Sequence, residues 1–516
     1  MRRGLLGALG ATAALAVAGT AVPASGTAVS ASSTTRAREA AHPWSARPAA
    51  CPHWGRPAIA ADPRPHALRV FAIQFEQRPA AMVSAAAYRR AIGCALAREV
   101  LPHLARGRPN LVVFDEDVGL ETMAIGPRGA AARALLRSRR YGCGATSLCP
   151  TLTTLNAIDT GYRRALRYLQ PRFPGLGAEI GRGFVAATDE FVRVFMTTMA
   201  QAALRYRIYV IASNTQAPFR LTRSRAAVAA LADPGARGIR AVYAPTRGRA
   251  LDQTFVWGPR VVRRHAPPPL ANLLADNVKV PLTGFEQALG FAAGPARGVA
   301  ARRNLRPVPI PGTGARLGIA TSLPAFTYGP AGARSACADV AVTYMRCLDR
   351  LGANVVIQAD ANNGPWTGGD GSDPAEHWQP LSWMGSAYRA VSDPTVHFAY
   401  AVNPFMVGNL ADTPFDGQSA ILERGRRGRG CHYVGNAAFV TGEDQPANRA
   451  YAGAKPQFLA LAPWVVPDAP RPVLRTLGAT LANPYLSSED YVQTALIADL
   501  PFPVDSSRRG CVAAGR

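Results

Sequence analysis

One lysine stands out in a chain whose basic residues are almost all arginine. Of the 58 Lys and Arg residues, only Lys279 and Lys455 are lysines. A guanidinium stays charged inside proteins, whereas a buried lysine can be neutral near pH 7. A lysine kept in such a chain is therefore a candidate for chemistry that arginine cannot perform.

A carboxylate and a hydroxyl follow two apolar runs elsewhere in the chain. Glu116 comes after "PNLVVFD", and Ser322 comes after "RLGIAT". Hydrolysis of an amide or nitrile needs a nucleophile, a base that takes its proton, and positive charge or N–H donors at the developing oxyanion. A glutamate, a lysine and a serine could supply these functions if the fold brings them together. The alternative for Glu116 is an ordinary carboxylate at the end of a strand, and for Lys279 a surface residue.

The elements that must position these side chains alternate between strands and helices. Runs such as "ALRVFAIQF", "NLVVFDE", "IYVIAS", "RLGIATSL" and "NVVIQAD" predict buried strands. Segments with helical apolar spacing, such as "SAAAYRRAIGCALAREVLPHLARG" and "TDEFVRVFMTTMAQAALRYR", lie between them. Strand–helix–strand alternation predicts an α/β domain.

The order of these motifs resembles the nitrilase, or carbon–nitrogen hydrolase, superfamily. "ALRVFAIQF" is similar to that family's first strand, "PNLVVFDEDVGL" to its glutamate segment and "NVKVPLTGFEQALGF" to its lysine segment. "LGANVVIQADANNGPW" and "VNPFMVGNLADTPFDGQSAI" are similar to later segments, so the resemblance covers roughly residues 67–425. It implies a four-layer α-β-β-α sandwich, often dimerised through its helices.

The same resemblance implies roles for individual residues. Glu116 would be the general base and Lys279 would stabilise the tetrahedral intermediate. Glu286 would orient Lys279 or the substrate, or would simply be solvated. The resemblance implies no cofactor and no metal ion, and the cysteines show no CxxC spacing that would indicate a zinc site.

The nucleophile position departs from the family pattern. Aligning "LGIATS" with the family's strand places Ser322 where the family has cysteine, and the tyrosine and aspartate that usually follow are replaced by Leu323 and Pro324. A serine hydroxyl is far less acidic than a thiol. A second alignment, with residues 327–336 as an insertion, places Cys337 at this position. We favour Ser322, and a disulfide or a buried cysteine is the alternative for Cys337.

The chain is expected to divide into four segments. Residues 1–31 have the basic start, apolar run and small-residue cleavage sites of a secretory signal peptide, with an uncleaved membrane anchor as the alternative. Residues 32–66 are predicted to be a linker rich in Ala, Pro and Ser. Residues 67–445 would form the catalytic domain, with an insertion around 125–187, and residues 446–516 a C-terminal extension.

Charge and cysteine content suggest where the protein works. Eight cysteines in an exported chain suggest disulfides, and Cys143 and Cys149 could close a small loop. The formal net charge of +25 comes from arginines spread along the whole chain. That spread favours attraction to anionic cell-envelope polymers, and we do not expect a nucleic-acid partner.

These observations predict a secreted hydrolase that acts on a linear amide, a nitrile or an N-acyl compound. The competing hypothesis is a binding protein that keeps the fold and pocket but has lost catalysis along with the cysteine. An acyltransferase of the membrane-bound kind found in this superfamily fits less well, because those enzymes have many membrane spans.

Overall fold

The computed structural model describes most of the chain from residue 51 to residue 515. The residues in this range that it leaves undescribed are 139, 143–148, 331–334, 365, 369–378, 411–412, 427–430, 432, 435–456, 465–470, 482–490 and 505–509. The predicted signal peptide, most of the predicted linker and the first part of the predicted C-terminal extension therefore lie outside the described residues.

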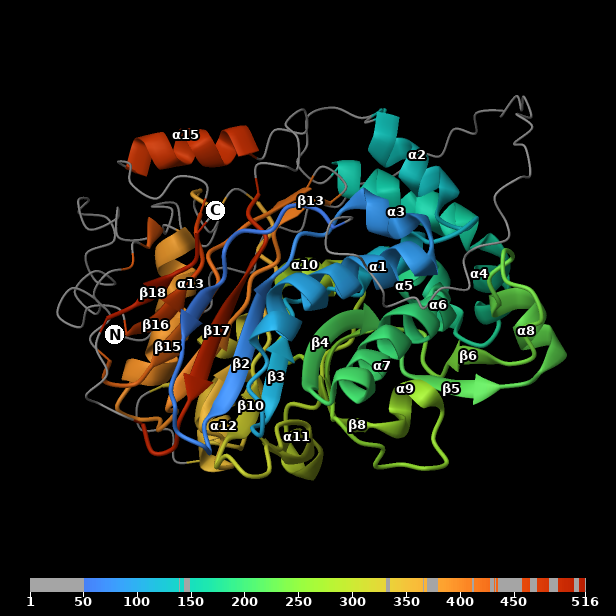
Figure 1. The fold of residues 1–516 in the computed structure, drawn as a ribbon. Helices are drawn as coiled ribbons and strands as arrows, with labels where there is room; N and C mark the ends of the chain where they lie inside the picture. The colour runs from blue at the N-terminus through green and yellow to red at the C-terminus, as the bar shows by residue number, and fades with distance from the viewer. Residues whose placement is uncertain are drawn as a thin grey trace.

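The structure is a mixed α/β fold with two large sheets (Figure 1), so the predicted α/β class is confirmed. The strand order in the first sheet is β1-β17-β2-β3-β4-β7-β8. Its strands are β1 (Ala58–Ala60), β17 (Thr494–Leu500), β2 (Leu68–Gln74), β3 (Asn110–Val113), β4 (Tyr209–Gln216), β7 (Leu251–Trp257) and β8 (Leu273–Val278).

The second sheet has the order β18-β16-β15-β12-β11-β10-β9. Its strands are β18 (Val512–Ala513), β16 (Phe458–Leu461), β15 (Ala420–Glu423), β12 (Tyr400–Asn403), β11 (Val355–Ile357), β10 (Arg316–Ile319) and β9 (Val308–Pro309). Two small hairpins, β5 (Phe219–Thr222) with β6 (Val242–Pro245) and β13 (Gly408–Leu410) with β14 (Thr413–Phe415), complete the described strands.

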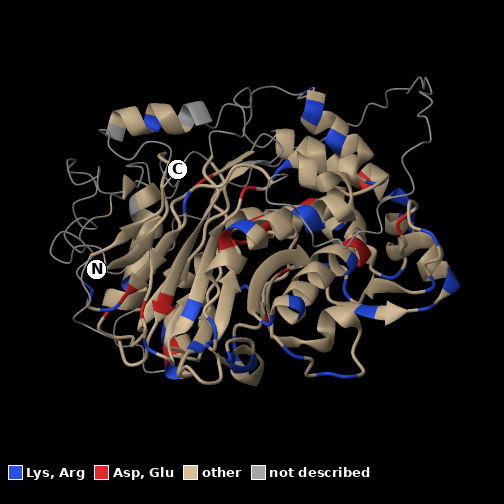
Figure 2. Ribbon diagram, viewed as in Figure 1, with Lys and Arg blue, Asp and Glu red and all other residues tan. Residues whose placement is uncertain are grey.

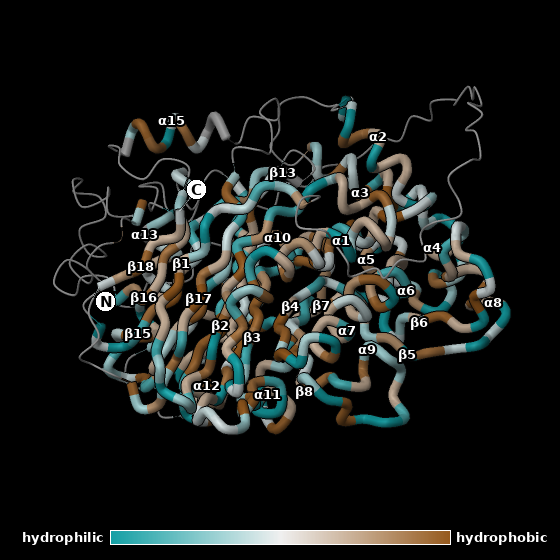
Figure 3. The backbone as a smooth tube through the Cα atoms, viewed as in Figure 1, coloured by the Kyte–Doolittle hydropathy of each residue, from teal (hydrophilic) through white to brown (hydrophobic). Residues whose placement is uncertain are grey.

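Neighbouring side chains of a strand point to opposite faces of the sheet and pack into separate hydrophobic cores. In β2, Val70 and Ala72 belong to a cluster that also contains Leu317 and Val355 of the second sheet. Their neighbours Phe71 and Ile73 belong to a different cluster, which includes helical residues. Because successive side chains of a strand point to opposite faces, one sequence run can bury both faces. The strands are accordingly among the most hydrophobic parts of the backbone (Figure 3).

Helices pack against each large sheet. In Figure 1, α1 (Ala85–Ala95) and α7 (Thr197–Tyr206) lie over the strands of the first sheet, and their side chains share its helical cluster. Residues of α12 (Val340–Arg350) and α13 (Gln379–Ser392) share a cluster with β11, β12 and β15 of the second sheet. The predicted helices beginning near residues 84 and 188 therefore exist, although both continue through irregular turns.

The segment predicted as an insertion, residues 125–187, is mostly helical where it is described. It contains α2 (Ala130–Ser138), α3 (Cys149–Gly161), α4 (Arg163–Leu169) and α5 (Arg182–Ala186). These helices form a fourth hydrophobic cluster with α8 (Arg225–Leu231) and β6. The remaining described helices are α6 (Thr188–Glu190), α9 (Pro268–Ala271), α10 (Gly284–Ala288), α11 (Gly298–Asn304) and α15 (Arg471–Leu481).

Both ends of the described chain are built into the sheets. The segment predicted as a linker contributes β1, and Cys51 forms a disulfide with Cys94 of α1. The segment predicted as an extension contributes β17, which pairs antiparallel with β2 along its whole length. The sequence prediction missed these pairings because short edge strands and strands distant in sequence carry no local signal of their partners.

Disulfides tie three described pairs of cysteines, namely Cys51–Cys94, Cys337–Cys347 and Cys431–Cys511. Cys149 is disulfide-bonded too, whereas Cys143, its predicted partner, lies outside the described residues. Disulfides persist in oxidising compartments, so this pattern is consistent with an extracellular protein. Among the described helices, none has the length and apolar character needed to cross a membrane. Basic residues are scattered over many elements (Figure 2).

A buried ion pair holds both ends of the chain against β2. Asp499 of β17 is fully buried and accepts hydrogen bonds from Arg69 Nε at 2.8 Å and Nη2 at 2.7 Å. It also accepts one from Arg108 Nη2 at 3.2 Å and one from the Asp62 backbone N–H at 2.7 Å. One carboxylate therefore joins the N-terminal segment, β2 and β17.

Replacing this carboxylate, Asp499→Ala, should lower the free energy of unfolding by roughly 3–5 kcal/mol, because removing one partner of a buried ion pair leaves the other charge unpaired. Urea denaturation measures the change. The control is Arg297→Ala, which removes an exposed partner of Asp339 and should cost less than about 1 kcal/mol. Equal losses for the two variants would contradict the role given to Asp499.

Candidate active site

The candidate residues converge on one cavity at the ends of strands from both sheets. Glu116 lies three residues beyond β3, Lys279 follows β8 directly and Ser322 lies three residues beyond β10. All three, together with Glu286 of α10, line a cavity of about 240 Å³. The structure thus brings together residues from three separate regions of the sequence.

Lys279 is the centre of this site. Its Nζ donates hydrogen bonds to Glu116 Oε1 at 2.7 Å and Glu286 Oε1 at 2.8 Å, and lies 3.2 Å from Asp252 Oδ2. The lysine side chain is only 3% exposed. Two of the three ammonium N–H groups are thus hydrogen-bonded, whereas Asp252 contacts Lys279 as an ion pair.

The environment keeps Lys279 charged. Burial alone lowers its pKa, but the attraction of Glu116, Glu286 and Asp252 outweighs burial and raises the pKa well above the usual value. Lys279 therefore does not adopt the neutral state that burial alone can give a lysine. Lys279 is buried, however, so the alternative of a surface lysine does not hold.

One ammonium cannot neutralise three carboxylates, and their pKa values separate accordingly. Burial, opposed by Lys279 and assisted by Glu286, raises the pKa of Glu116 to about 7. Burial raises the pKa of Asp252 well above its usual value. Glu286 moves the other way: although burial raises its pKa, Lys279 and Thr283 more than compensate and lower it. Near pH 7 the lasting charges are Lys279 and Glu286, while Glu116 can exchange a proton.

Local structure fixes the two glutamates. Glu286 is the third residue of α10 and forms a capping box, in which its Oε2 accepts from the Thr283 backbone N–H and Thr283 Oγ1 accepts from the Glu286 N–H. Glu116 Oε2 accepts a hydrogen bond from the Ala361 backbone N–H at 2.9 Å. Each glutamate therefore presents one oxygen to Lys279 and has the other held by the backbone, so the alternative of a solvated Glu286 does not hold.

Ser322 has a backbone conformation that L-residues rarely adopt. Its φ is 57° and its ψ is −124°, at the turn between β10 and the short 3-10 helix of residues 323–326. Its N–H donates to the Ala359 carbonyl at 3.1 Å, which holds the turn against the chain beyond β11. Such strain costs of order 1–3 kcal/mol and clusters at functional sites. A nucleophilic serine on a sharp strand-to-helix turn has this kind of geometry in unrelated hydrolases.

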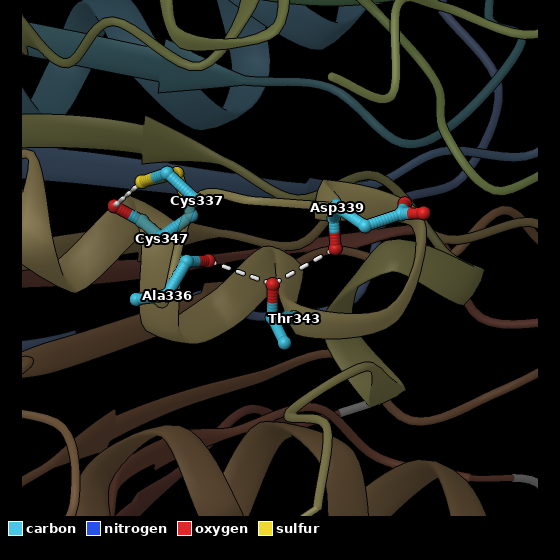
Figure 4. The surroundings of a disulfide bond; sticks show 5 residues. All are labelled: Ala336, Cys337, Asp339, Thr343 and Cys347. Atoms are coloured by element: carbon cyan, nitrogen blue, oxygen red, sulfur yellow. Dashed lines mark hydrogen bonds between the residues drawn. A yellow bond between two sulfur atoms is a disulfide. The ribbon is translucent and has the colours of Figure 1, made fainter. Parts of the chain in front are cut away.

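Cys337 is not placed where a nucleophile is needed. It forms a disulfide with Cys347 of α12, beside the Thr343 hydroxyl that bonds the carbonyls of Ala336 and Asp339 (Figure 4). It is absent from the described residues that line the cavity. No cysteine is free among the described residues. Ser322, and not Cys337, stands at the site.

Sequence reasoning missed Asp252 and Asp117. Asp252 lies on β7 and is 1% exposed, and Asp117 lines the cavity with a φ of 57°. Burial, reinforced by the nearby Asp252, raises the pKa of Asp117 to about 7. The only local signal for Asp252 is an acidic residue near the start of a strand whose first half is polar, which is a common surface pattern.

The three carboxylates are the described group that comes nearest to a metal site. Ligand oxygens of Glu116, Asp252 and Glu286 lie within 4.8 Å of one another. However, Lys279 Nζ already contacts all three, and a divalent cation would have to displace its ammonium. The donor set fits a lysine better than a metal ion.

Comparison with known proteins gives distant structural matches. No family model and no curated protein matches the chain. The amidase from Nesterenkonia sp. is 12% identical over 70% of this chain and 84% of its own, with a TM-score of 0.32. A cysteine-to-alanine variant of the Nesterenkonia AN1 amidase, from the nitrilase superfamily, is 13% identical over 70% and 84%, with a TM-score of 0.33. TM-scores this low do not establish a shared activity or shared site residues.

Glycine at position 322 should relieve the strain, whereas alanine should not. We expect Ser322→Gly to be more stable than Ser322→Ala by about 1 kcal/mol, because glycine adopts positive φ without a steric penalty. Both variants lack the hydroxyl, so the comparison isolates the backbone. Thermal and urea unfolding measure the difference, and an alanine variant as stable as the glycine variant would show that Ser322 is not strained.

Proposed function

We propose that this protein is an exported carbon–nitrogen hydrolase of the nitrilase type that cleaves a linear amide through an acyl-ester on Ser322. The observation that carries this proposal is the convergence of Glu116, Lys279 and a strained Ser322 on one buried cavity. The ordered motifs of the sequence support it. We also propose that the fold has the four layers of the family, in the order helix, sheet, sheet, helix. A hydrophobic cluster that contains residues of both sheets supports this layering.

The proposed first half-reaction forms an ester. Ser322 Oγ attacks the amide carbon while Glu116 takes the hydroxyl proton, and a tetrahedral oxyanion forms. Breakdown of this intermediate breaks the carbon–nitrogen bond, and the amine leaves with the proton from Glu116. In the second half-reaction water attacks the ester, gives its proton to Glu116, and releases the carboxylic acid and the serine hydroxyl.

The oxyanion would be stabilised by Lys279 and by the backbone of the turn. Lys279 can turn one N–H toward the oxyanion by giving up Asp252, its longest contact at 3.2 Å. The Leu323 N–H begins the short helix after Ser322, and the first N–H groups of a helix have no intrahelical partner. A fixed positive charge and a fixed N–H donor are the groups that acyl transfer requires.

The raised pKa of Glu116 suits a serine nucleophile. A carboxylate with a pKa of about 7 is a stronger base than an ordinary glutamate, yet much of it is ionised at neutral pH. This partly offsets the low acidity of a hydroxyl compared with a thiol. The charged Lys279 beside Glu116 further favours negative charge in the site.

The second candidate is a non-catalytic binding protein. It is favoured by the serine itself and by the fact that Lys279 is already held by three carboxylates, two of them through hydrogen bonds. This candidate predicts that small amides protect the protein against unfolding without being hydrolysed.

Hydrolysis of a panel of amides, nitriles and N-acyl compounds tests the proposal. The wild-type protein should release ammonia or amine, and Ser322→Ala and Glu116→Gln should each lose at least about a hundredfold in kcat, since the nucleophile or the base is removed. The controls are Ser419→Ala and Glu99→Gln, buried residues outside the cavity lining, which should retain activity. Activity unchanged in Ser322→Ala would refute the assignment.

A thiol at the same position provides a second readout. The Ser322→Cys variant should become sensitive to iodoacetamide while the wild type stays insensitive, because no described cysteine is free to react. Mass spectrometry of the modified protein locates the label. A folded Ser322→Cys variant whose new thiol does not react would show that position 322 is not accessible to a ligand.

The pH dependence should report Glu116. A base works only when deprotonated, so kcat/KM should rise with pH and level off above an apparent pKa near 7. Because burial raises the pKa of Glu116, this acid limb lies well above that of an ordinary glutamate. A profile flat from pH 5 to pH 8 would contradict the role of Glu116.

A further inference from the structure

The cavity has two walls of different chemistry. One wall carries the charged site, with Glu116, Lys279 and Glu286. The other is apolar and comes from residues that also belong to the cluster of the helical segment 125–187 and its neighbours. The cavity residues of this apolar wall are Met123, Leu155, Ile158, Phe184, Leu289 and Phe291.

The apolar wall is packed and ordered by its own contacts. Phe184 and Phe291 meet edge to face with ring centroids 5.0 Å apart. Leu155 and Ile158 lie one turn apart on α3, so both point to the same side of the helix. An apolar surface that is already ordered binds an apolar group without the entropy cost of ordering its side chains.

The size of the cavity fits a substantial group. A dry apolar cavity of about 150 Å³ is known to hold a benzene molecule. The cavity here measures about 240 Å³. It therefore accommodates a ring or a chain of several carbons in addition to the reacting amide.

A charge on the ring or chain of the substrate would be unfavourable in this cavity. The described cavity lining contains no arginine and no histidine, and its one cation, Lys279, is already bound by three carboxylates. An anionic group would be buried without a partner, which is costly. A cationic group would have to ionise Asp117 or Glu121, further carboxyls of the lining whose pKa values burial raises, or compete with Lys279 for its partners.

The apolar group belongs on the acyl side of the amide. The leaving amine becomes a cation near neutral pH, and its release across an apolar wall would bury that charge. The acyl part, in contrast, stays attached to Ser322 until water arrives and is uncharged throughout that time. The apolar wall therefore suits the acyl part, which stays attached to Ser322.

We propose that the site selects uncharged amides whose acyl part is a bulky apolar chain or ring, and that Leu155, Ile158, Phe184 and Phe291 determine this selectivity. The proposal rests on the function proposed above for Ser322.

Binding to the Ser322→Ala variant tests selectivity apart from turnover. By calorimetry, the affinity should rise about fourfold for each methylene from propanamide to hexanamide, the value for burying one methylene. Adipic acid monoamide and 6-aminohexanamide add a charge to the end of the same chain and should not bind measurably. N-butylacetamide is an isomer of hexanamide with its chain on the amine side, and it should bind more weakly.

Turnover by the wild-type protein separates the two proposals. Hexanamide that binds but is not hydrolysed would overturn the hydrolase and leave the selectivity standing. Preferred hydrolysis of acetamide, adipic acid monoamide or N-butylacetamide would overturn the selectivity and leave the hydrolase standing. Preferred hydrolysis of hexanamide supports both.

A matched pair of variants tests the assigned wall. Leu155→Ala enlarges the cavity and should shift the preference from hexanamide toward octanamide. Leu169→Ala removes the same atoms from the same cluster, but Leu169 does not line the cavity, so the preference should not shift. Equal shifts, or no shift with Leu155→Ala in a folded protein, would show that the wall is assigned incorrectly.

Discussion

A buried ammonium held by three carboxylates is the interaction on which the rest of the site depends. Lys279 gathers Glu116 from beyond β3, Asp252 from β7 and Glu286 from α10, so three elements must meet within hydrogen-bond reach of one atom. Because the charges do not balance, burial raises the pKa of Asp252 well above its usual value and the pKa of Glu116 to about 7. The same shortage of positive charge that is costly for folding produces a base suited to neutral pH.

Ser322 and the disulfides fit one chemical setting. A thiol nucleophile must stay reduced, whereas the described cysteines are all oxidised. A serine such as Ser322, in the proposed role of nucleophile, cannot form a disulfide or be oxidised in this way. The strained turn that presents Ser322 is held by the Ala359 carbonyl and by strand β10, so the backbone and not the side chain determines its position.

The sequence allowed the strands and most of the site to be predicted, because both depend on local patterns. Alternating apolar residues marked β2, and the rarity of lysine marked Lys279. Asp252 escaped detection because only its neighbours in space distinguish it from a surface carboxylate. The place of β17 between β1 and β2 also escaped detection, since pairing over more than 400 residues leaves no mark in either strand's own pattern.

The helical segment of residues 125–187 has a larger role than an insertion between two strands would suggest. Strand ends hold the charged groups rigidly, and this arrangement allows little variation without loss of the Lys279 network. The helices of this segment contribute mainly apolar side chains to the cavity, and such side chains can change size while the charges stay in place. Under the proposed function, reactivity and selectivity would be supplied by different parts of the chain, one anchored in the sheets and the other packed against them.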